Sequence, residues 1–252
     1  MSKRAVIIGA SSGIGAALAR RLSKEGYRLG LAARRLELLE SLQGELHQPS
    51  VLKHLDLRSP EKAVESMREL IQNLGGIDLI VVNSGIDVPD ADLEWKKQLE
   101  VIQVNVIGFI AMSCLAAQYF EKQQYGHLVG ISSITCLRGN GRSPAYSASK
   151  AFVSNYMEGL RQRIGTSKIS VTDIRPGFVD TPMLNERKLT FWMASADKAA
   201  GQIYTAIKRK RRYAYITRRW NLIGQIYQRI PGPICDYLFK KVMAQEKAYK
   251  AK

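Results

Sequence analysis

Short runs of apolar residues alternate along the chain with longer segments in which apolar residues recur every three or four positions. Runs of the first kind predict strands, and segments of the second kind predict helices. The predicted strands are 5–8, 28–32, 51–56, 77–83, 127–132, 169–174 and 213–216. The predicted helices are 14–25, 35–46, 60–74, 99–123, 145–164 and 196–208.

The predicted strands are almost entirely apolar, which is typical of strands that are covered on both faces. Their alternation with helices predicts an α/β fold with a doubly wound, Rossmann-type parallel sheet, whose ligands bind beyond the carboxyl ends of the strands. No linker rich in serine or glycine divides the chain. We therefore expect one catalytic domain over residues 1–216 and a basic helical extension over residues 217–252.

Residues 101–120 contain no charged side chain and are long enough to span a membrane. Gln103, Asn105 and Gln118 interrupt this stretch, and it lies within the strand–helix alternation. We therefore predict a helix that is buried between the sheet and a second copy of the chain.

The composition excludes several classes of protein. With 252 residues, 46% of them hydrophobic and 24% charged, the chain is neither disordered nor collagen-like. Three widely spaced cysteines favour neither a disulfide framework nor a zinc site, so we expect no metal and a reducing compartment. The apolar run 5–8 is too short for the core of a signal peptide, which indicates a cytoplasmic location.

The net charge of +16 is concentrated near the C-terminus, where residues 208–252 carry 13 basic and two acidic side chains. Apolar residues in this tail follow a helical spacing that a Pro-Gly-Pro sequence interrupts. Two basic amphipathic helices predict peripheral association with a membrane surface, with Trp220, Ile223 and Ile230 inserting. The alternative is that the apolar side packs on the domain or on a partner subunit. Nucleic acid is not an expected partner, because no recognition motif accompanies the charge.

A glycine-rich turn, with the spacing G-x3-G-x-G, follows the first predicted strand and precedes a helix. Glycines allow close approach of the backbone, and a helix N-terminus attracts phosphate. The position of the turn indicates dinucleotide binding, although such turns also occur for structural reasons alone. Arg34 and Arg35 end the second strand, where arginine accommodates a 2′-phosphate and an acidic residue would bind a ribose hydroxyl. The pair favours NADP(H), and the alternative is a solvated start of a helix.

Tyr146 and Lys150 are four residues apart on a predicted helix, so their side chains lie on one face. A neighbouring cation favours the phenolate and makes a tyrosine usable as a general acid or base. The Tyr-x3-Lys spacing is common by chance, but Ser132 and Ser133 end a strand just upstream and make chance a poor explanation.

Taken together, these motifs resemble the classical short-chain dehydrogenase/reductase family over about residues 4–216. In chain order they are Gly9-x3-Gly13-x-Gly15, Asp56–Leu57, Asn83-Ser84-Gly85, Asn105, Ser133, Tyr146-x3-Lys150, Pro176–Gly177 and Thr181. Ser84 departs from the usual alanine of the family, but it is small enough to leave the backbone unchanged.

The resemblance implies catalytic roles for Asn105, Ser133, Tyr146 and Lys150 in transferring a hydride between a nicotinamide and a carbonyl carbon. Tyr146 would protonate the carbonyl oxygen while Ser133, which the family spacing selects over Ser132, hydrogen-bonds that oxygen. Lys150 would tune Tyr146 and hold the nicotinamide ribose. Asn105 would anchor a water molecule in a proton relay.

The resemblance also implies how the chain binds its cofactor. Asp56 and Leu57 would flank the adenine, Asn83 and Gly85 would pack against its ribose, and residues after Gly177 would contact the carboxamide. The expected cofactor-binding residues are Gly9, Ser11, Ser12, Gly13, Ile14, Gly15, Arg34, Arg35, Asp56, Leu57, Asn83, Gly85, Tyr146, Lys150, Pro176, Gly177, Val179 and Thr181.

In this family the segment after Thr181 covers the substrate, and here residues 182–195 are mostly apolar and aromatic. Its large apolar residues are Met183, Leu184, Leu189, Phe191, Trp192 and Met193. They favour a lipophilic carbonyl substrate, unless they only close the lid onto the core. The family also pairs the helix of residues 101–120 and the helix that begins near Ala145 between subunits, which implies a homodimer or homotetramer.

The leading hypothesis is therefore an NADPH-dependent carbonyl reductase. The alternatives are an NAD(P)+-linked alcohol dehydrogenase and a non-catalytic, NADP-bound scaffold or redox sensor. The intact set of four catalytic residues argues against the last of these.

Overall fold

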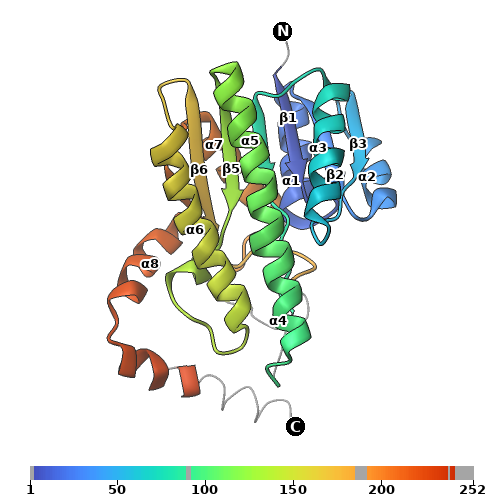
Figure 1. The fold of residues 1–252 in the computed structure, drawn as a ribbon. Coiled ribbons are helices and arrows are strands. Elements are labelled where there is room, and N and C mark those ends of the chain that lie inside the picture. Colours follow the sequence, from blue (N-terminus) through green and yellow to red (C-terminus); the bar gives the residue numbers. More distant parts are fainter. Residues whose placement is uncertain (1–2, 89–91, 185–191, 238, 242–252) are drawn as a thin grey trace.

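The computed structural model describes residues 3–88, 92–184, 192–237 and 239–241. Seven parallel strands form one sheet in the order β3-β2-β1-β4-β5-β6-β7 (Figure 1). The strands are β1 (Arg4–Ile8), β2 (Arg28–Ala33), β3 (Ser50–His54), β4 (Leu79–Val82), β5 (Gly126–Ile131), β6 (Ile169–Pro176) and β7 (Tyr213–Ile216). The order reverses between β1 and β4, and such a switch point opens a crevice for ligands.

Helices cover both faces of this sheet, with α3, α5 and α6 on one face and α1 and α7 on the other (Figure 1). The main helices are α1 (Gly13–Lys24), α2 (Leu36–Gln43), α3 (Pro60–Leu74), α4 (Trp95–Ile102), α5 (Phe109–Gln123), α6 (Pro144–Ile164), α7 (Ala196–Lys208) and α8 (Arg219–Arg229). Along β1, Val6 and Ile8 contribute to one core, while Ala5 and Ile7 contribute to the core on the opposite face. The apolar runs in the sequence therefore arise because successive side chains are buried on both sides.

The predicted doubly wound parallel sheet is confirmed, and the predicted helix at 99–123 differs in its detail. This helix begins at Trp95, and a π-helical turn (Gln103–Gly108) separates α4 from α5. Among the described residues, Trp95–Gln123 is long and apolar enough to cross a membrane. In the fold, however, half of its apolar window is buried, and Met112 and Phe120 lie in the core beside α3 and the sheet.

The C-terminal extension is packed on the domain. After β7, α8 contacts that strand and the 3₁₀ helix Ile134–Leu137. Trp220 is only 7% exposed and forms a cluster with Ile134 and Tyr215, against which Ile223 also packs. The prediction that Trp220 and Ile223 insert into a membrane is therefore wrong, because both face the domain.

A second helical segment starts at Gly232, and the expected break at the Pro-Gly-Pro sequence is present. Among the described residues of this extension, the large apolar side chains left exposed are Leu222, Ile226, Ile234 and Tyr237. Within the predicted extension over residues 217–252, position 238 and residues 242–252 lie outside the described residues.

We predict that Trp220→Ala destabilises the protein by about 3–5 kcal/mol, because a buried indole is replaced by a cavity. Leu222→Ala is the matched control, since Leu222 is 66% exposed on the same helix and its loss should change stability by about 0.5 kcal/mol or less. Urea unfolding of both variants measures the difference. Equal effects of the two substitutions would contradict this packing of α8.

Candidate active site

One cavity of about 260 Å³ lies beyond the carboxyl ends of the strands, as a doubly wound sheet dictates. All but one of the predicted cofactor-binding residues line it, the exception being Gly15. Ser133, Tyr146 and Lys150 line the same cavity, whereas Asn105 does not. Segments that are far apart in the sequence therefore place the predicted groups around one space.

The glycine turn between β1 and α1 leaves no room for side chains. Gly9 has a φ of +85°, and a Cβ atom there would lie 2.7 Å from the backbone nitrogen of Ser84. A Cβ atom at Gly15 would lie 2.1 Å from the carbonyl oxygen of Gly9. Gly15 therefore allows α1 to pack on the turn although it does not line the cavity. The first turn of α1 contains no acidic residue, so its positive end fits a phosphate group.

Two arginines border the cavity at the end of β2 and have different neighbours. The guanidinium of Arg35 donates hydrogen bonds to the hydroxyls of Ser11 and Ser12 in the glycine turn, at 3.2 and 3.0 Å. Arg34 lines the cavity near Asp56, whose carboxylate forms an ion pair with Arg58 at 2.7 Å. Burial raises the pKa of Asp56, but the hydrogen bonds and charge of Arg58, together with Arg34, outweigh burial and hold it below its ordinary value. This end of the cavity therefore has a net positive charge.

Tyr146 and Lys150 lie on one face of α6, with the lysine Nζ 5.7 Å from the centre of the phenol ring. Lys150 is only 4% exposed and donates a hydrogen bond to the carbonyl oxygen of Ile131 at 3.0 Å. Burial lowers the pKa of Lys150 to about 8, against the opposing effect of the charges of Asp173 and Asp87. The ammonium group is therefore held beside the phenol at neutral pH.

Asn105 is buried in the π-helical turn between α4 and α5. Its Oδ1 accepts a hydrogen bond from the nitrogen of Ile86 at 2.8 Å, and its Nδ2 donates to the oxygens of Ile86 and Ser149 at 2.8 and 3.0 Å. The amide thus fixes the segment after β4 to α6. A Cβ atom at Gly85 would lie 3.0 Å from Lys150 Nζ and 3.4 Å from Asn105 Oδ1, so these three residues meet at one point. π-helical turns are frequent at functional sites.

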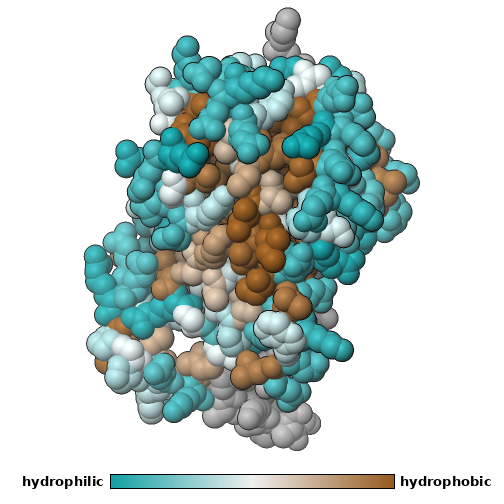
Figure 2. Space-filling view, viewed as in Figure 1, coloured by the Kyte–Doolittle hydropathy of each residue, from teal (hydrophilic) through white to brown (hydrophobic). Residues whose placement is uncertain are grey.

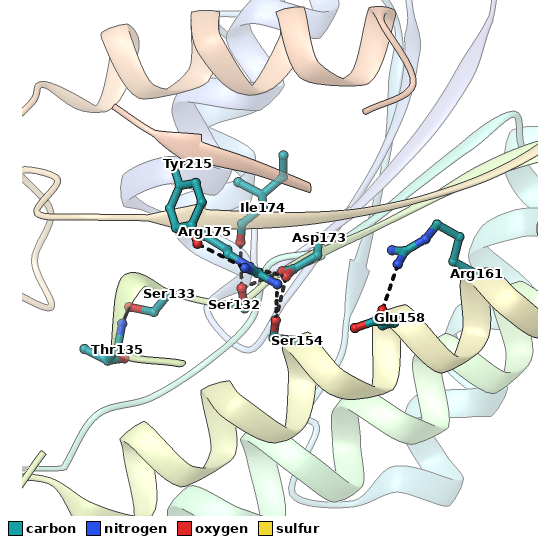
Figure 3. Close-up of polar contacts among 10 residues, drawn as sticks. All are labelled: Ser132, Ser133, Thr135, Ser154, Glu158, Arg161, Asp173, Ile174, Arg175 and Tyr215. Atoms are coloured by element: carbon teal, nitrogen blue, oxygen red, sulfur yellow. Dashed lines mark hydrogen bonds and ion pairs between the residues drawn. The ribbon is translucent and has the colours of Figure 1, made fainter. Parts of the chain in front are cut away.

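The two serines that end β5 have different partners. Ser133 Oγ accepts a hydrogen bond from the nitrogen of Thr135 at 3.2 Å, and caps the 3₁₀ helix. Ser132 Oγ donates to the Asp173 carboxylate at 2.5 Å, so its hydroxyl is engaged in a buried network (Figure 3). Both serines and Tyr146 line the cavity, and the choice of Ser133 as the catalytic serine stays a prediction. No sequence pattern indicated the hydrogen-bond network that engages Ser132.

Other residues that line the cavity were not predicted. They are Ala33, Leu55, Ser84, Ile86, Asp87, Val104, Ile131, Ser132, Ile134, Thr135 and Phe178. Most of them adjoin a predicted motif or the end of a strand, and that position is the signal that could have identified them. Phe178 is different, because it comes after the Pro-Gly turn and its ring packs against Trp220 of the C-terminal extension.

Part of the predicted substrate lid is described. Met183 and Leu184 line the cavity, while Trp192 and Met193 are 39% and 40% exposed. The backbone oxygen of Trp192 accepts a hydrogen bond from Arg219 at 2.7 Å, which joins the end of the lid to α8. Leu189 and Phe191 lie outside the described residues. Within the part of the chain that is described, no group of three His, Cys, Asp or Glu side chains could hold a metal ion.

Known proteins with similar sequences indicate the family of this chain. Residues 3–190 match the family model of the short chain dehydrogenases. An uncharacterized oxidoreductase of Myxococcus xanthus is 37% identical over 203 residues, covering 77% of this chain and 80% of that protein.

Two solved structures share the fold. 3-Ketoacyl-(acyl-carrier-protein) reductase from Brucella melitensis, complexed with NADH, superposes with a TM-score of 0.76 at 22% identity, covering 84% of this chain and 95% of that chain. ElxO with NADP bound gives a TM-score of 0.78 at 21% identity, covering 87% and 99% of the two chains. The shared fold thus accommodates both cofactors and does not select one.

The lowered pKa of Lys150 predicts a pH-dependent stability. From about pH 8 to the ordinary lysine value of 10.5, the unfolded chain binds a proton that the native protein has released, so this residue makes stability rise with pH. The expected slope is on the order of 1 kcal/mol per pH unit at most. Urea unfolding of the parent protein and of Lys150→Met at about pH 7.5 and about pH 9.5 measures it. A difference between the two proteins that does not change with pH would contradict the prediction.

Proposed function

The chain belongs to the short-chain dehydrogenase family of oxidoreductases, and we propose that it reduces the carbonyl group of a hydrophobic ketone or aldehyde with NADPH. The observation that carries this proposal is that Ser133, Tyr146 and Lys150 line the same cavity as the glycine turn and the two arginines. A reducing cofactor and a proton donor could thus act on the carbon and the oxygen of one carbonyl group.

The residues around the cavity fit a dinucleotide. The glycine turn, which lines the cavity at Gly9 and Gly13, and the N-terminus of α1 suit the pyrophosphate. Arg34 and Arg35 suit a 2′-phosphate, Asp56 and Leu57 suit the adenine end, and Val179 and Thr181 border the opposite end. Bound NADPH supplies the hydride that the carbonyl carbon receives.

Side chains of the protein protonate the carbonyl oxygen of the substrate and hydrogen-bond to it. Tyr146 donates its hydroxyl proton to that oxygen, and Ser133 donates a hydrogen bond to it as negative charge develops. The buried ammonium of Lys150 favours the phenolate that Tyr146 becomes. Asn105 holds the segment after β4 against α6 and keeps Lys150 beside Gly85. The proposal also includes a water molecule, anchored by Asn105, that relays protons.

The apolar residues near the opening of the cavity support a lipophilic substrate. Phe178, Met183 and Leu184 line the cavity, and Trp192 lies at the described end of the lid. Such a surface gains binding energy from apolar groups of the substrate and adapts to their shape through methionine.

We expect Tyr146→Phe to lower the turnover of carbonyl reduction by at least about 100-fold while NADPH still binds, because only the proton donor is removed. A panel of long-chain and polycyclic ketones and aldehydes, followed by NADPH consumption, provides the assay. Tyr125→Phe is the matched control, since Tyr125 is 43% exposed outside the cavity. Parent-like turnover of Tyr146→Phe would remove Tyr146 from the mechanism. A parent protein that binds NADPH but turns over no substrate in either direction would instead support a scaffold or sensor.

The preference for NADPH depends on Arg34 and Arg35. Replacing both by alanine should weaken the binding of NADPH by at least about tenfold more than that of NADH, because only NADPH carries the 2′-phosphate. Fluorescence titration with both cofactors measures the two affinities. Arg28→Ala, at the opposite end of β2, is the control. An equal loss for the two cofactors, or a parent protein that prefers NADH, would show that the cofactor is assigned wrongly.

The proposed enzyme is a homodimer or homotetramer joined through α5 and α6. Figure 2 shows apolar side chains gathered in a stripe over the face that these helices form. Leu99 and Ile107, at the start of the same long helical segment, are 42% and 39% exposed. An apolar surface of this kind is more often covered by a partner than left in water. Sedimentation velocity at micromolar concentration would detect the assembly.

The proposed location is the cytoplasm, with a fraction of the enzyme at the membrane surface through the C-terminal extension. The groups that could insert are the four exposed apolar residues of this extension, and not Trp220. Arg218, Arg229, Lys240 and Lys241 are also exposed there. Each basic residue near an anionic surface contributes about 1 kcal/mol to binding.

We therefore expect co-sedimentation with anionic vesicles and little with neutral vesicles at low salt. Leu222→Ser/Ile226→Ser should reduce the salt-resistant part of this binding, because apolar insertion is not screened by salt. The matched control is Gln225→Ser, an exposed polar position on the same helix. If the parent protein stays in the supernatant with anionic vesicles, the extension serves only for packing.

A further inference from the structure

An ion pair between the buried Asp173 and the partly buried Arg175 is hydrogen-bonded to Ser132, the neighbour of the proposed catalytic serine, and has no part in the mechanism above. Asp173 on β6 is 2% exposed, and one of its carboxylate oxygens lies 2.6 Å from Nε of Arg175 (Figure 3). Both side chains come from the strand that follows α6. Burying two charges is costly unless hydrogen bonds satisfy them, so their remaining contacts matter.

The Asp173 carboxylate joins the end of β5 to α6. Ser132 Oγ donates a hydrogen bond to Oδ1 at 2.5 Å, and Ser154 Oγ donates to Oδ2 at 2.8 Å. Ser132 directly precedes Ser133, so its position fixes the backbone that carries the catalytic hydroxyl. One carboxylate therefore holds the strand that presents Ser133 and the helix that presents the other catalytic groups.

Ser154 lies on the catalytic face of α6. It follows Lys150 by four residues and Tyr146 by eight, and this spacing places all three side chains along one stripe of the helix. A hydrogen bond to Ser154 consequently fixes the rotation of the helix that sets the direction of Tyr146 and Lys150.

Arg175 completes the network and connects it to the edge of the sheet. Its guanidinium donates to Ser154 Oγ at 2.7 Å and to the hydroxyl of Tyr215 at 3.1 Å. It also lies over the ring of Tyr213, at 4.9 Å from the ring centre. Tyr215 packs with Trp220, so the network extends from the catalytic serine to the anchor of the C-terminal extension.

We propose that Asp173 and Arg175 are positioning residues, which hold Ser133 in register with Tyr146 and Lys150 through the hydroxyls of Ser132 and Ser154. The kinetic consequence rests on the proposed carbonyl reduction, whereas the structural consequence does not. For stability alone, an apolar pair of similar size would often serve as well as a buried ion pair. The directional hydrogen bonds to two catalytic elements supply what an apolar pair cannot, namely a fixed geometry.

Asp173→Asn tests the proposal, because it keeps the size of the side chain and leaves Arg175 without its counter-charge. The turnover of carbonyl reduction should fall by about tenfold to a hundredfold, because small displacements of catalytic groups slow a reaction by factors of this size. The KM for NADPH should stay within about twofold, since the glycine turn and the arginines are untouched. The primary deuterium isotope effect with NADPH deuterated at the transferred position should increase, because hydride transfer becomes slower than product release. A smaller folded fraction would lower turnover without changing this isotope effect.

Thr172→Val is the matched control on the same strand. Thr172 is fully buried and hydrogen-bonded to His127 and the carbonyl oxygen of Arg211, but it does not contact Ser132 or Ser154. Removal of the Thr172 hydroxyl should lower the stability of the protein and leave turnover and the isotope effect unchanged. If Asp173→Asn does not fold, Ser132→Ala carries the same test, because it leaves the ion pair intact and removes only the link to β5.

Hydrogen exchange supplies a readout that does not depend on turnover. The amide of Thr135, which donates to Ser133 Oγ, should exchange faster in Asp173→Asn than in the parent protein or in Thr172→Val. Parent-like exchange, or parent-like turnover with an unchanged isotope effect, would overturn the positioning role. A parent protein that reduces no carbonyl compound would overturn the proposed function instead, and the exchange measurement would then decide the positioning role by itself.

Discussion

The candidate active site depends on one constraint, which is that parallel strands, the central ones buried on both faces, end at a common edge. Because the faces are sealed by α3, α5 and α6 on one side and α1 and α7 on the other, polar groups can gather only where the strands stop. The glycine turn follows β1, the two arginines follow β2, and Ser133 follows β5. Tyr146 and Lys150 reach the same cavity from α6, which crosses from β5 to β6.

This arrangement places charged groups where water has little access, and two sets of contacts offset the loss of hydration. Lys150 keeps a hydrogen bond to the carbonyl oxygen of Ile131, and the negative charge of Asp173 partly offsets the effect of burial on its pKa. Asp173 and Arg175 satisfy each other and two serine hydroxyls. Both solutions fix orientations, since a buried charge tolerates few alternative geometries.

The C-terminal extension packs directly behind residues that line the cavity. A Cβ atom at Gly177 would lie 2.0 Å from Nε1 of Trp220, so only glycine leaves room for the indole. The indole also packs against the ring of Phe178, which lines the cavity. Arg219 reaches the backbone of Trp192 at the end of the lid. A change in the position of α8 would therefore displace Phe178 in the lining of the cavity and the backbone at Trp192.

The sequence alone determined the seven strands, the helices between them, the glycine turn and the Tyr146–Lys150 face, because covalent spacing fixes which side chains share a face. The resemblance of the sequence to the short-chain dehydrogenase/reductase family is confirmed. Most of the residues named from that resemblance line one cavity in the fold. Only the tertiary structure decided which hydroxyl of the two adjacent serines joins Asp173, and that Trp220 is buried while Leu222 is exposed. Neighbouring residues have similar local patterns, and what separates them is contact with elements distant in the chain. The π-helical turn around Asn105 is likewise set by packing, since its sequence continues the helical pattern without a break.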